Sequence, residues 1–345
     1  MWPFSSSFVG RRAPDIVGQD WFNIASLPGD LAQTVRAGNP LRFKEELAGR
    51  VVVVDFWDYS CINCINTMPY LKEWWKRYRE YNFLIIGVHS PEFEFAKDKD
   101  KVESAVLRFG LSYPVVSDPE FITWKAYRNN VWPRELIVDS RGIVRHDHKG
   151  EGGYLEKEKK IQDLLSVLHP DVVFDDPMTP VHETDAEGAV CRPATPEVYF
   201  GGARGDSANP EDLHVGSEFV YQFPRDIGIH QWAFSGSWRV ESQEAFSAEG
   251  AGVAIHYAAD EVFGVMRPND CSYVDIEVQQ DDAPLSPENA GEDILFVDGK
   301  SMVRVDADRL YRLVKNPAYG QHFVTLFVRQ GSLALHTATF RSSCE

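Results

Sequence analysis

Continuous apolar runs and helical periods alternate in the first half of the chain. Apart from Asp55, residues 51–57 (VVVVDFW) and 83–88 (FLIIGV) form continuous apolar runs, which are typical of strands buried on both faces of a sheet. Between them, in residues 61–80, apolar side chains recur every three or four positions and predict a helix. The pattern therefore predicts a sheet that is covered by helices.

The remaining elements of this half complete a mixed sheet. Further helices are predicted at 101–109, 121–127 and 156–168, and further strands at 113–116, 135–139 and 143–145. Ser140-Arg141-Gly142 separates the last two strands and predicts a hairpin. Strands that alternate with helices and end in a hairpin and a helix predict an α/β domain over residues 41–170. Residues 1–40 mix Gly, Pro and short apolar pieces and predict a loop-rich lead-in.

The pattern changes after residue 170. Residues 171–196 are rich in Asp, Pro and Thr and have no sustained period, so they are predicted to be a linker. From residue 197 onward, short alternating runs are separated by clusters of Gly, Pro, Asn and Asp. No stretch there has a helical period. Residues 197–345 are therefore predicted to form an all-β sandwich of jelly-roll type.

Charge divides the chain in the same way. The net charge is −17, yet residues 1–170 contain 23 Lys+Arg and 23 Asp+Glu, so residues 171–345 supply the whole excess of acid. This asymmetry supports two units of different character. It also argues against nucleic acid or an anionic membrane surface as a partner of the acidic half.

No apolar run approaches the roughly 20 residues that cross a bilayer, so no transmembrane segment is expected. The first 14 residues hold a short apolar stretch that is followed by Arg11-Arg12, which is the reverse of a secretory leader. The absence of a leader predicts a cytoplasmic protein.

The cysteines indicate the chemistry. Cys61 and Cys64 form a C-x-x-C pair, whereas Cys191, Cys271 and Cys344 are scattered. Cys61 falls at the first turn of the predicted helix, where free backbone N–H groups and the helix dipole favour a thiolate. Cys64 lies one turn further in, within disulfide reach and more buried. This asymmetry suits thiol–disulfide exchange, in which an exposed thiolate attacks and a second thiol resolves the mixed disulfide.

Three other functions are alternatives to a reductase for the C-x-x-C pair, and each is compared with the sequence in turn. A zinc site needs two more Cys or His ligands, usually a close pair, and Cys191, Cys271 and Cys344 are far away in the second half of the chain. A redoxin-type thiol peroxidase has the pattern P-x-x-x-[ST]-x-x-C, but Val54 and Asp58 stand at the Pro and Ser/Thr positions. A non-enzymatic binding protein with a structural or metal-relaying C-x-x-C is the third alternative.

The motif resembles a known family. The chain closely resembles thioredoxin in residues 54–57 (VDFW), in the pair Cys61 and Cys64, and in Pro69, which follows Cys64 by five residues. The resemblance extends over about residues 40–170. The resemblance implies a thioredoxin-like fold, a dithiol reductase of protein disulfides, and no cofactor besides the redox-active disulfide. It also implies a cis peptide bond at Pro133, with the backbone of Trp132 contacting the substrate.

Asp55 stands six residues before Cys61, at the position of thioredoxin's buried acid. A carboxyl group in that strand is expected to have a raised pKa and to accept the proton of Cys64. The alternative is a strand aspartate that neighbouring hydrogen bonds satisfy.

The other motif residues have supporting roles in this interpretation. Trp57 and Tyr59 are expected beside the disulfide, in contact with substrate, although Trp57 also fits a purely core position. Ile62 and Asn63 lie between the cysteines and provide no basic residue, which predicts a mildly reducing couple. Pro69 is expected to shape the helix rather than to take part in chemistry.

A narrower resemblance covers nearly the whole chain. The chain resembles the soluble C-terminal part of DipZ-type proteins in three motifs, at residues 57–64 (WDYSCINC), 88–95 (VHSPEFEF) and 150–154 (GEGGY). It also resembles the TlpA-like, redoxin-type branch of the family, which inserts a β-α unit into the thioredoxin fold. In this chain the insertion corresponds to residues 89–130. DipZ-type proteins fuse a CcdA-type membrane domain to a thioredoxin-like domain and a carbohydrate-binding-like, galactose-binding-like β domain. The resemblance implies a CcdA-type membrane protein or a thioredoxin system as electron donor, a glycan as ligand of the β domain, and a periplasmic or other extracytoplasmic setting.

Cys191 precedes the first predicted strand of the β domain and Cys344 follows its last. Because the ends of such domains often lie close together, a Cys191–Cys344 disulfide is expected if the protein meets an oxidising compartment. Three buried free thiols, including Cys271, are the competing prediction.

Overall fold

The two apolar runs form the central strands of a mixed sheet, β2 (Val51–Trp57) and β3 (Phe83–His89), which pair in parallel. Every residue of both strands is buried. The remaining strands of this sheet are β1 (Trp21–Phe22), β4 (Val115–Ser117), β5 (Arg134–Val138) and β6 (Val144–Lys149). The strand order is β1-β4-β3-β2-β5-β6, with β5 antiparallel to both β2 and β6. This computed structural model describes residues 7–186 and 188–344. Residues 1–6, the first part of the segment that was compared with a secretory leader, lie outside the described residues.

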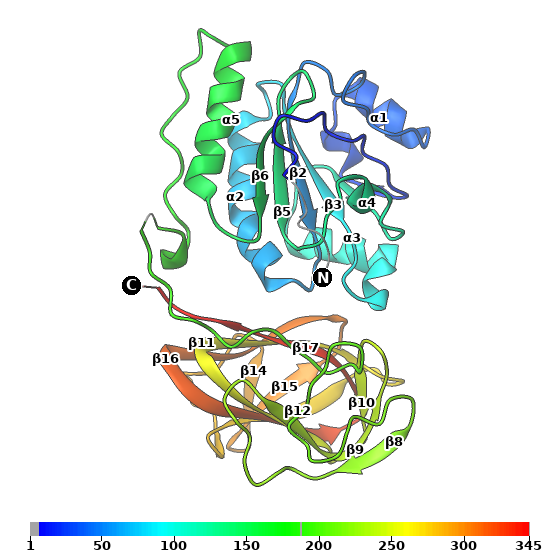
Figure 1. Cartoon of the computed structure of the whole chain (residues 1–345), viewed down its shortest axis with the longest axis vertical. Helices are drawn as coiled ribbons and strands as arrows, with labels where there is room; N and C mark the ends of the chain where they lie inside the picture. The colour runs from blue at the N-terminus through cyan, green and yellow to red at the C-terminus, as the bar shows by residue number, and fades with distance from the viewer. Residues whose placement is uncertain (1–6, 187, 345) are drawn as a thin grey trace. The chain divides into compact units, whose positions relative to one another are not determined.

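Helices cover both faces of this sheet (Figure 1). They are α1 (Gly29–Arg36), α2 (Ile62–Tyr78), α3 (Lys99–Arg108), α4 (Ile122–Ala126) and α5 (Tyr154–Leu168), with short 3₁₀ turns at Ile24–Ser26, Glu94–Lys97 and Glu183–Asp185. Figure 1 shows α2 and α5 on one side and α1, α3 and α4 on the other. Tyr70 of α2 and Tyr154 of α5 stack with ring centroids 3.6 Å apart, which joins these two helices.

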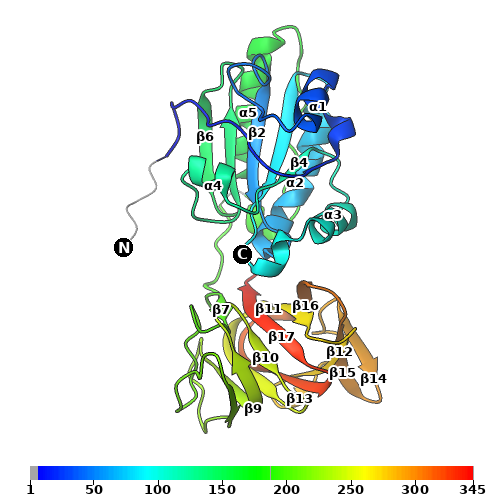
Figure 2. The same ribbon diagram turned by 90° about the vertical axis from the view of Figure 1, so that its right-hand side faces the viewer.

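The described part of the second unit consists of strands that are joined by turns and loops. The strands are β7 (Val198–Tyr199), β8 (Glu218–Tyr221), β9 (Trp232–Val240), β10 (Ala245–Ser247), β11 (Gly252–Pro268), β12 (Val274–Gln280), β13 (Ala283–Pro284), β14 (Ile294–Val297), β15 (Lys300–Val305), β16 (Arg309–Gln330) and β17 (Leu333–Arg341). Their pairings are antiparallel, and β17 lies between β11 and β10 (Figure 2). The prediction of an α/β domain followed by an all-β domain is confirmed.

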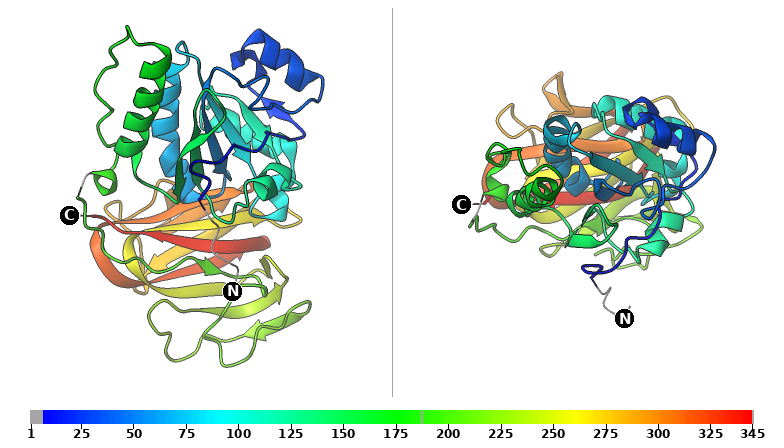
Figure 3. Two further views of the ribbon diagram at one scale, coloured as in Figure 1. Left: turned by 45° about the horizontal axis from the view of Figure 1, so that its top comes forward. Right: turned by 90° about the horizontal axis from the view of Figure 1, so that it is seen from above.

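Two long strands make the β unit continuous. The first part of β11, from Gly252 to Ile255, pairs with β9, and its later part, from Glu261 to Pro268, pairs with β17. Strand β16 is 22 residues long, pairs with β11 along most of its length and curves through the unit (Figure 3). Register shifts near Ala259 and Val262 accompany the change of partner. The strands are thus linked by hydrogen bonds into one sheet.

The chain divides into its two units between residues 186 and 187, inside the stretch that was expected to be a linker. The first part of that stretch packs on the α/β unit, because the buried Glu158 accepts a hydrogen bond from the Met178 N–H at 2.9 Å and Phe174 packs edge-on against Tyr78. The lead-in likewise contributes β1 and α1. In the described part of the chain, no helix combines the length and apolar character needed to cross a bilayer.

Candidate active site

The cysteine pair lies where β2 gives way to α2. Cys61 is the N-cap residue of α2, and its Sγ accepts a hydrogen bond from the Cys64 N–H at 3.2 Å. Cys61 and Cys64 are joined as a disulfide with Cα atoms 5.3 Å apart. Cys61 is partly exposed, whereas Cys64 is only 2% exposed. A substrate can therefore reach the first sulfur, and the second is sheltered behind it.

Asp58 fixes the loop before Cys61. Its Oδ1 accepts hydrogen bonds from the Ser60 N–H at 2.7 Å and the Ser60 hydroxyl at 2.5 Å. Its Oδ2 accepts one from the Glu92 N–H at 3.0 Å, which ties the loop to the segment after β3. Both Asp58 and Ser60 are buried. Asp58 was considered only as a mismatch to the peroxidase pattern, and its role in holding this loop was missed.

His89, at the end of β3, packs beneath the same loop. Its ring lies edge-on to Trp57 and stacks on Tyr59, with centroid distances of 5.0 and 5.4 Å. Within the described residues neither ring nitrogen has a hydrogen-bond partner, and burial lowers the pKa of His89. Trp57 and Tyr59 are each 1% exposed and pack against the His89 ring. Their contact with substrate therefore stays a prediction.

Trp132 and Pro133 lie beside the loop and are joined by a cis peptide bond. Strand β5 starts at the next residue, and its pairing of Arg134 with Phe56 brings Pro133 next to the end of β2. The Trp132 indole donates to the Ser90 carbonyl at 2.8 Å, and its ring lies 4.3 Å from that of Trp124. Trp132 is half-buried. The segment of Trp132 and Pro133 is therefore held beside the ends of β2 and β3.

Asp55 is 2% exposed in the middle of β2. Among the described residues no group donates a hydrogen bond to its Oδ1. Burial raises the pKa of Asp55 well above its ordinary value; nearby Glu135 raises it further, and Lys157 opposes both. Glu135 and Lys157 were not singled out from the sequence. The available signal was a glutamate directly before the apolar run Leu136-Ile137-Val138.

The first turns of α2 place the remaining motif residues. Ile62 is buried and Asn63 is exposed between the cysteines. The Asn63 carbonyl accepts a hydrogen bond from the Thr67 hydroxyl at 3.0 Å. Pro69 lies inside the helix, where it cannot donate to the carbonyl of Ile65.

Outside this site, Cys191 and Cys344 are joined as a disulfide across a span of 153 residues. Cys271 is exposed and unpaired with another described cysteine, and its Sγ lies 3.7 Å from the Ser332 carbonyl oxygen. In the described ranges, no group of three or more His, Cys, Asp or Glu residues is arranged to hold a metal ion.

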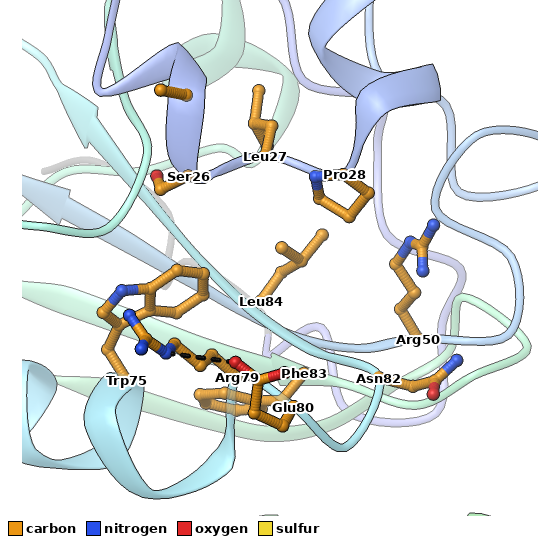
Figure 4. Close-up of a pocket in the computed structure, with 11 residues that line it drawn as sticks. Ser26, Leu27, Pro28, Arg50, Trp75, Arg79, Glu80, Asn82, Phe83 and Leu84 are labelled. Carbon is orange, nitrogen blue, oxygen red and sulfur yellow. Dashed lines mark ion pairs between the residues drawn. The ribbon is translucent and has the colours of Figure 1, made fainter.

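A pocket of about 440 Å³ lies at the other end of the sheet (Figure 4). Trp75 of α2 and Arg79 line one side, and Leu27 and Pro28 line the other. It opens beside the first residues of β3, whereas Cys61 follows the last residue of the parallel strand β2. The pocket is therefore separate from the cysteine pair.

Comparison with known proteins agrees with this geometry. Residues 9–147 match the AhpC/TSA family, and residues 195–340 match the family described as thioredoxin like C-terminal domain. Protein DipZ of Mycobacterium bovis is 33% identical over 257 residues, which are 74% of this chain and 35% of DipZ. The chain is therefore similar to DipZ and to thioredoxin-like oxidoreductases. It spans about a third of the length of the DipZ proteins that it matches and resembles them across both units.

Smaller proteins match a part of the chain. The thiol-disulfide oxidoreductase YkuV of Bacillus subtilis is 26% identical over 124 residues, 36% of this chain and 83% of YkuV. The solved structure of a thiol-disulfide isomerase from Corynebacterium glutamicum covers 45% of this chain and 97% of its own, with a TM-score of 0.37 and 24% identity.

Proposed function

We propose that the chain is a dithiol reductase of protein disulfides, with Cys61 as nucleophile and Cys64 as resolving thiol. The observation that carries this proposal is the unequal exposure of the two sulfurs at the start of α2. The free N–H groups of the first helical turn stabilise a thiolate on Cys61. The buried Cys64 is left to react only with the sulfur next to it.

The reaction proceeds in two exchanges. The Cys61 thiolate attacks a substrate disulfide, forms a mixed disulfide and releases the first substrate thiolate. Cys64 then loses its proton to Asp55 and attacks the Cys61 sulfur, which releases the second substrate thiolate and forms the Cys61–Cys64 disulfide. Two electrons pass from the dithiol to the substrate. In this proposal the main chain of Trp132, beside the cis Pro133, aligns the substrate strand.

The electron donor, the β-unit ligand and the compartment are also parts of this proposal. From the family resemblance of the sequence motifs, we propose a CcdA-type membrane protein as donor, with a thioredoxin system as the alternative, and a glycan as ligand of the β unit. The Cys191–Cys344 disulfide supports an extracytoplasmic setting, because such bonds persist in oxidising compartments. The cytoplasmic setting expected from the first residues stays a competing prediction.

Reduction of insulin disulfides tests the activity. The reduced chain should accelerate insulin precipitation, Cys61→Ser should abolish this effect, and Cys64→Ser should accumulate a mixed disulfide that is visible on a non-reducing gel. Cys271→Ser is the matched control and should behave as the unmodified chain. Peroxide consumption that survives Cys64→Ser would instead identify a thiol peroxidase, and stoichiometric zinc bound by the pair would indicate a metal-binding protein. A reduction potential near −270 mV fits a reductant, and one near −120 mV fits an oxidant.

A further inference from the structure

Asp55 belongs to a buried cluster of three ionisable side chains. Asp55 of β2 and Glu135 of β5 are direct partners in an antiparallel pair, so their side chains leave the sheet on the same face. Lys157 of α5 contacts Glu135 Oε2. Glu135 and Lys157 are fully buried and Asp55 nearly so. In the described part of the chain, neither Asp55 Oδ1 nor Glu135 Oε1 has a hydrogen-bond donor. Two carboxyl groups therefore share one buried cation.

The cluster is connected to the helix that carries the cysteines. Thr67 of α2 donates to the carbonyl of Asn63, which lies between Cys61 and Cys64, and its hydroxyl is 3.1 Å from the Tyr154 hydroxyl. Tyr154 is the first residue of α5, and its ring lies 4.4 Å from the Lys157 ammonium. Packing of α5 on α2 thus fixes where the charge of Lys157 stands relative to the first turn of the active-site helix.

We infer that Glu135 and Lys157 are positioning residues that set when Asp55 takes the proton of Cys64. This inference rests on the proposed reductase function and assigns to that site two residues that the thioredoxin-like motif does not contain. With both carboxylates ionised, the cluster carries a charge of −1, and after uptake of one proton it is neutral. Without the ammonium of Lys157, the net charge of the cluster would be −2 before the proton is taken up and −1 afterwards. Both states would be costly, because a net charge is buried in each.

The proton step is balanced within the chain. The proton leaves the Cys64 thiol for the Asp55 carboxylate, the new Cys64 thiolate forms a bond to Cys61 Sγ, and the bond from Cys61 to the substrate sulfur breaks. The released substrate thiolate takes a proton from solvent. When an external donor later reduces the Cys61–Cys64 disulfide, Asp55 returns its proton to Cys64.

Other titratable groups around the cluster come from three elements. Tyr113 precedes β4, Tyr154 begins α5, and His146 and His148 lie on β6. Burial raises the pKa values of both tyrosines, so they stay neutral, and burial lowers the pKa of His146. His148 is the strand partner of Glu135, and its Nε2 lies 3.2 Å from the Glu151 carbonyl oxygen. The opposite charges that act on Asp55 are therefore those of Glu135 and Lys157.

The test is the pH profile of the full chain. Single-turnover oxidation of the dithiol form by a model disulfide peptide is followed by tryptophan fluorescence from pH 5 to 10, and the titration that disappears in Asp55→Asn is assigned to Asp55. Glu135→Gln removes a negative neighbour and should lower that apparent pKa by about one pH unit. The double variant Glu135→Gln/Lys157→Met removes both charges at similar volume, and its pKa should fall between those of Glu135→Gln and the unmodified chain.

Glu158→Gln is the matched control, because Glu158 is an equally buried carboxylate on α5 that is paired with Arg77 and Tyr78. It should lower stability and leave the profile in place. Unshifted profiles in an active Glu135→Gln protein and in the double variant would overturn the inference, as would an unchanged profile in Asp55→Asn. Failure of the unmodified chain to reduce the peptide at any pH would instead overturn the proposed function.

Discussion

Asp55 lies inside β2 and His89 is the last residue of β3, and burial shifts the pKa values of these two side chains in opposite directions. The pKa of Asp55 is raised and that of His89 is lowered. Both shifts favour the uncharged form, as expected where water is excluded. Because the unfolded chain has no such shifts, each residue makes stability depend on pH.

Asp55→Asn should stabilise the chain at neutral and alkaline pH. The raised pKa means that the native carboxyl resists ionisation, so its contribution is fully present below the ordinary value of 3.8 and is lost as pH rises through the folded-state pKa. The variant should therefore match the unmodified chain near pH 3.5 and exceed its free energy of unfolding by about 2 kcal/mol or more at pH 8. Urea unfolding of the disulfide form at several pH values measures this difference, and an equal or lower stability at pH 8 would contradict it.

His89→Phe should remove part of the stability loss in acid. The pKa of His89 is lowered from 6.5, so its contribution is present above pH 6.5 and is lost as pH falls, because the unfolded chain takes up the proton more readily. Phenylalanine keeps a ring between Trp57 and Tyr59 and cannot ionise. Its melting temperature should fall less between pH 7.5 and 4.5 than that of the unmodified chain.

The control for this experiment is His214→Phe, in which the replaced ring stacks on Phe219 in the other unit. Its pH dependence should follow the unmodified chain. A His89→Phe protein that loses stability in acid as steeply as the unmodified chain would show that His89 is not responsible.

At the scale of elements, Asp118 lies four residues before α4, and its side chain accepts hydrogen bonds from the first turn of that helix. Its Oδ1 accepts from the Ile122 N–H at 2.7 Å, and its Oδ2 accepts from the Trp124 N–H at 2.8 Å. Trp124 in turn packs against Trp132. The short helix α4 therefore supports the segment that is proposed to align the substrate.

Asp118→Ala should cost about 2 kcal/mol of unfolding free energy, because it leaves buried N–H groups without acceptors. It should also raise KM for a disulfide peptide more than it lowers kcat, because Trp132 loses its support. Asp98→Ala is the control: Asp98 caps α3 through the Asp100 N–H, and its loss should lower stability without changing KM. A KM that stays constant in Asp118→Ala would refute the link to substrate alignment.

Local patterns were sufficient for the central elements of the α/β unit. Strands β2 and β3 are buried along their whole length, so their sequences are apolar almost throughout; Asp55 and His89 are the exceptions. The long strand β16 could not be predicted, because its extent depends on register with β11 and β12. Glu135 and Lys157 lie 22 residues apart, and no local period connects them. Cys61 and Cys64 were found because their spacing alone carries the chemistry.

At the scale of the whole molecule, the Cys191–Cys344 disulfide closes nearly the entire β unit into a loop. A cross-link over 153 residues removes so much freedom from the unfolded chain that the chain-entropy model assigns it about 5 kcal/mol. Cys191→Ser/Cys344→Ser should therefore lower the melting temperature of the β-unit transition in calorimetry of the full chain and leave that of the α/β unit unchanged. Equal transitions with and without the disulfide would contradict this prediction.

Two disulfides with opposite tasks therefore exist in one polypeptide. Cys191 is exposed, so reductants in solution can reach this bond as well as the partly exposed Cys61. If the β unit is to stay closed while the active pair cycles, its bond must have the lower reduction potential, as structural disulfides below about −300 mV do. The reduction potentials of the two disulfides therefore limit which electron donor can serve this chain. The donor must be able to reduce Cys61–Cys64 and unable to reduce Cys191–Cys344.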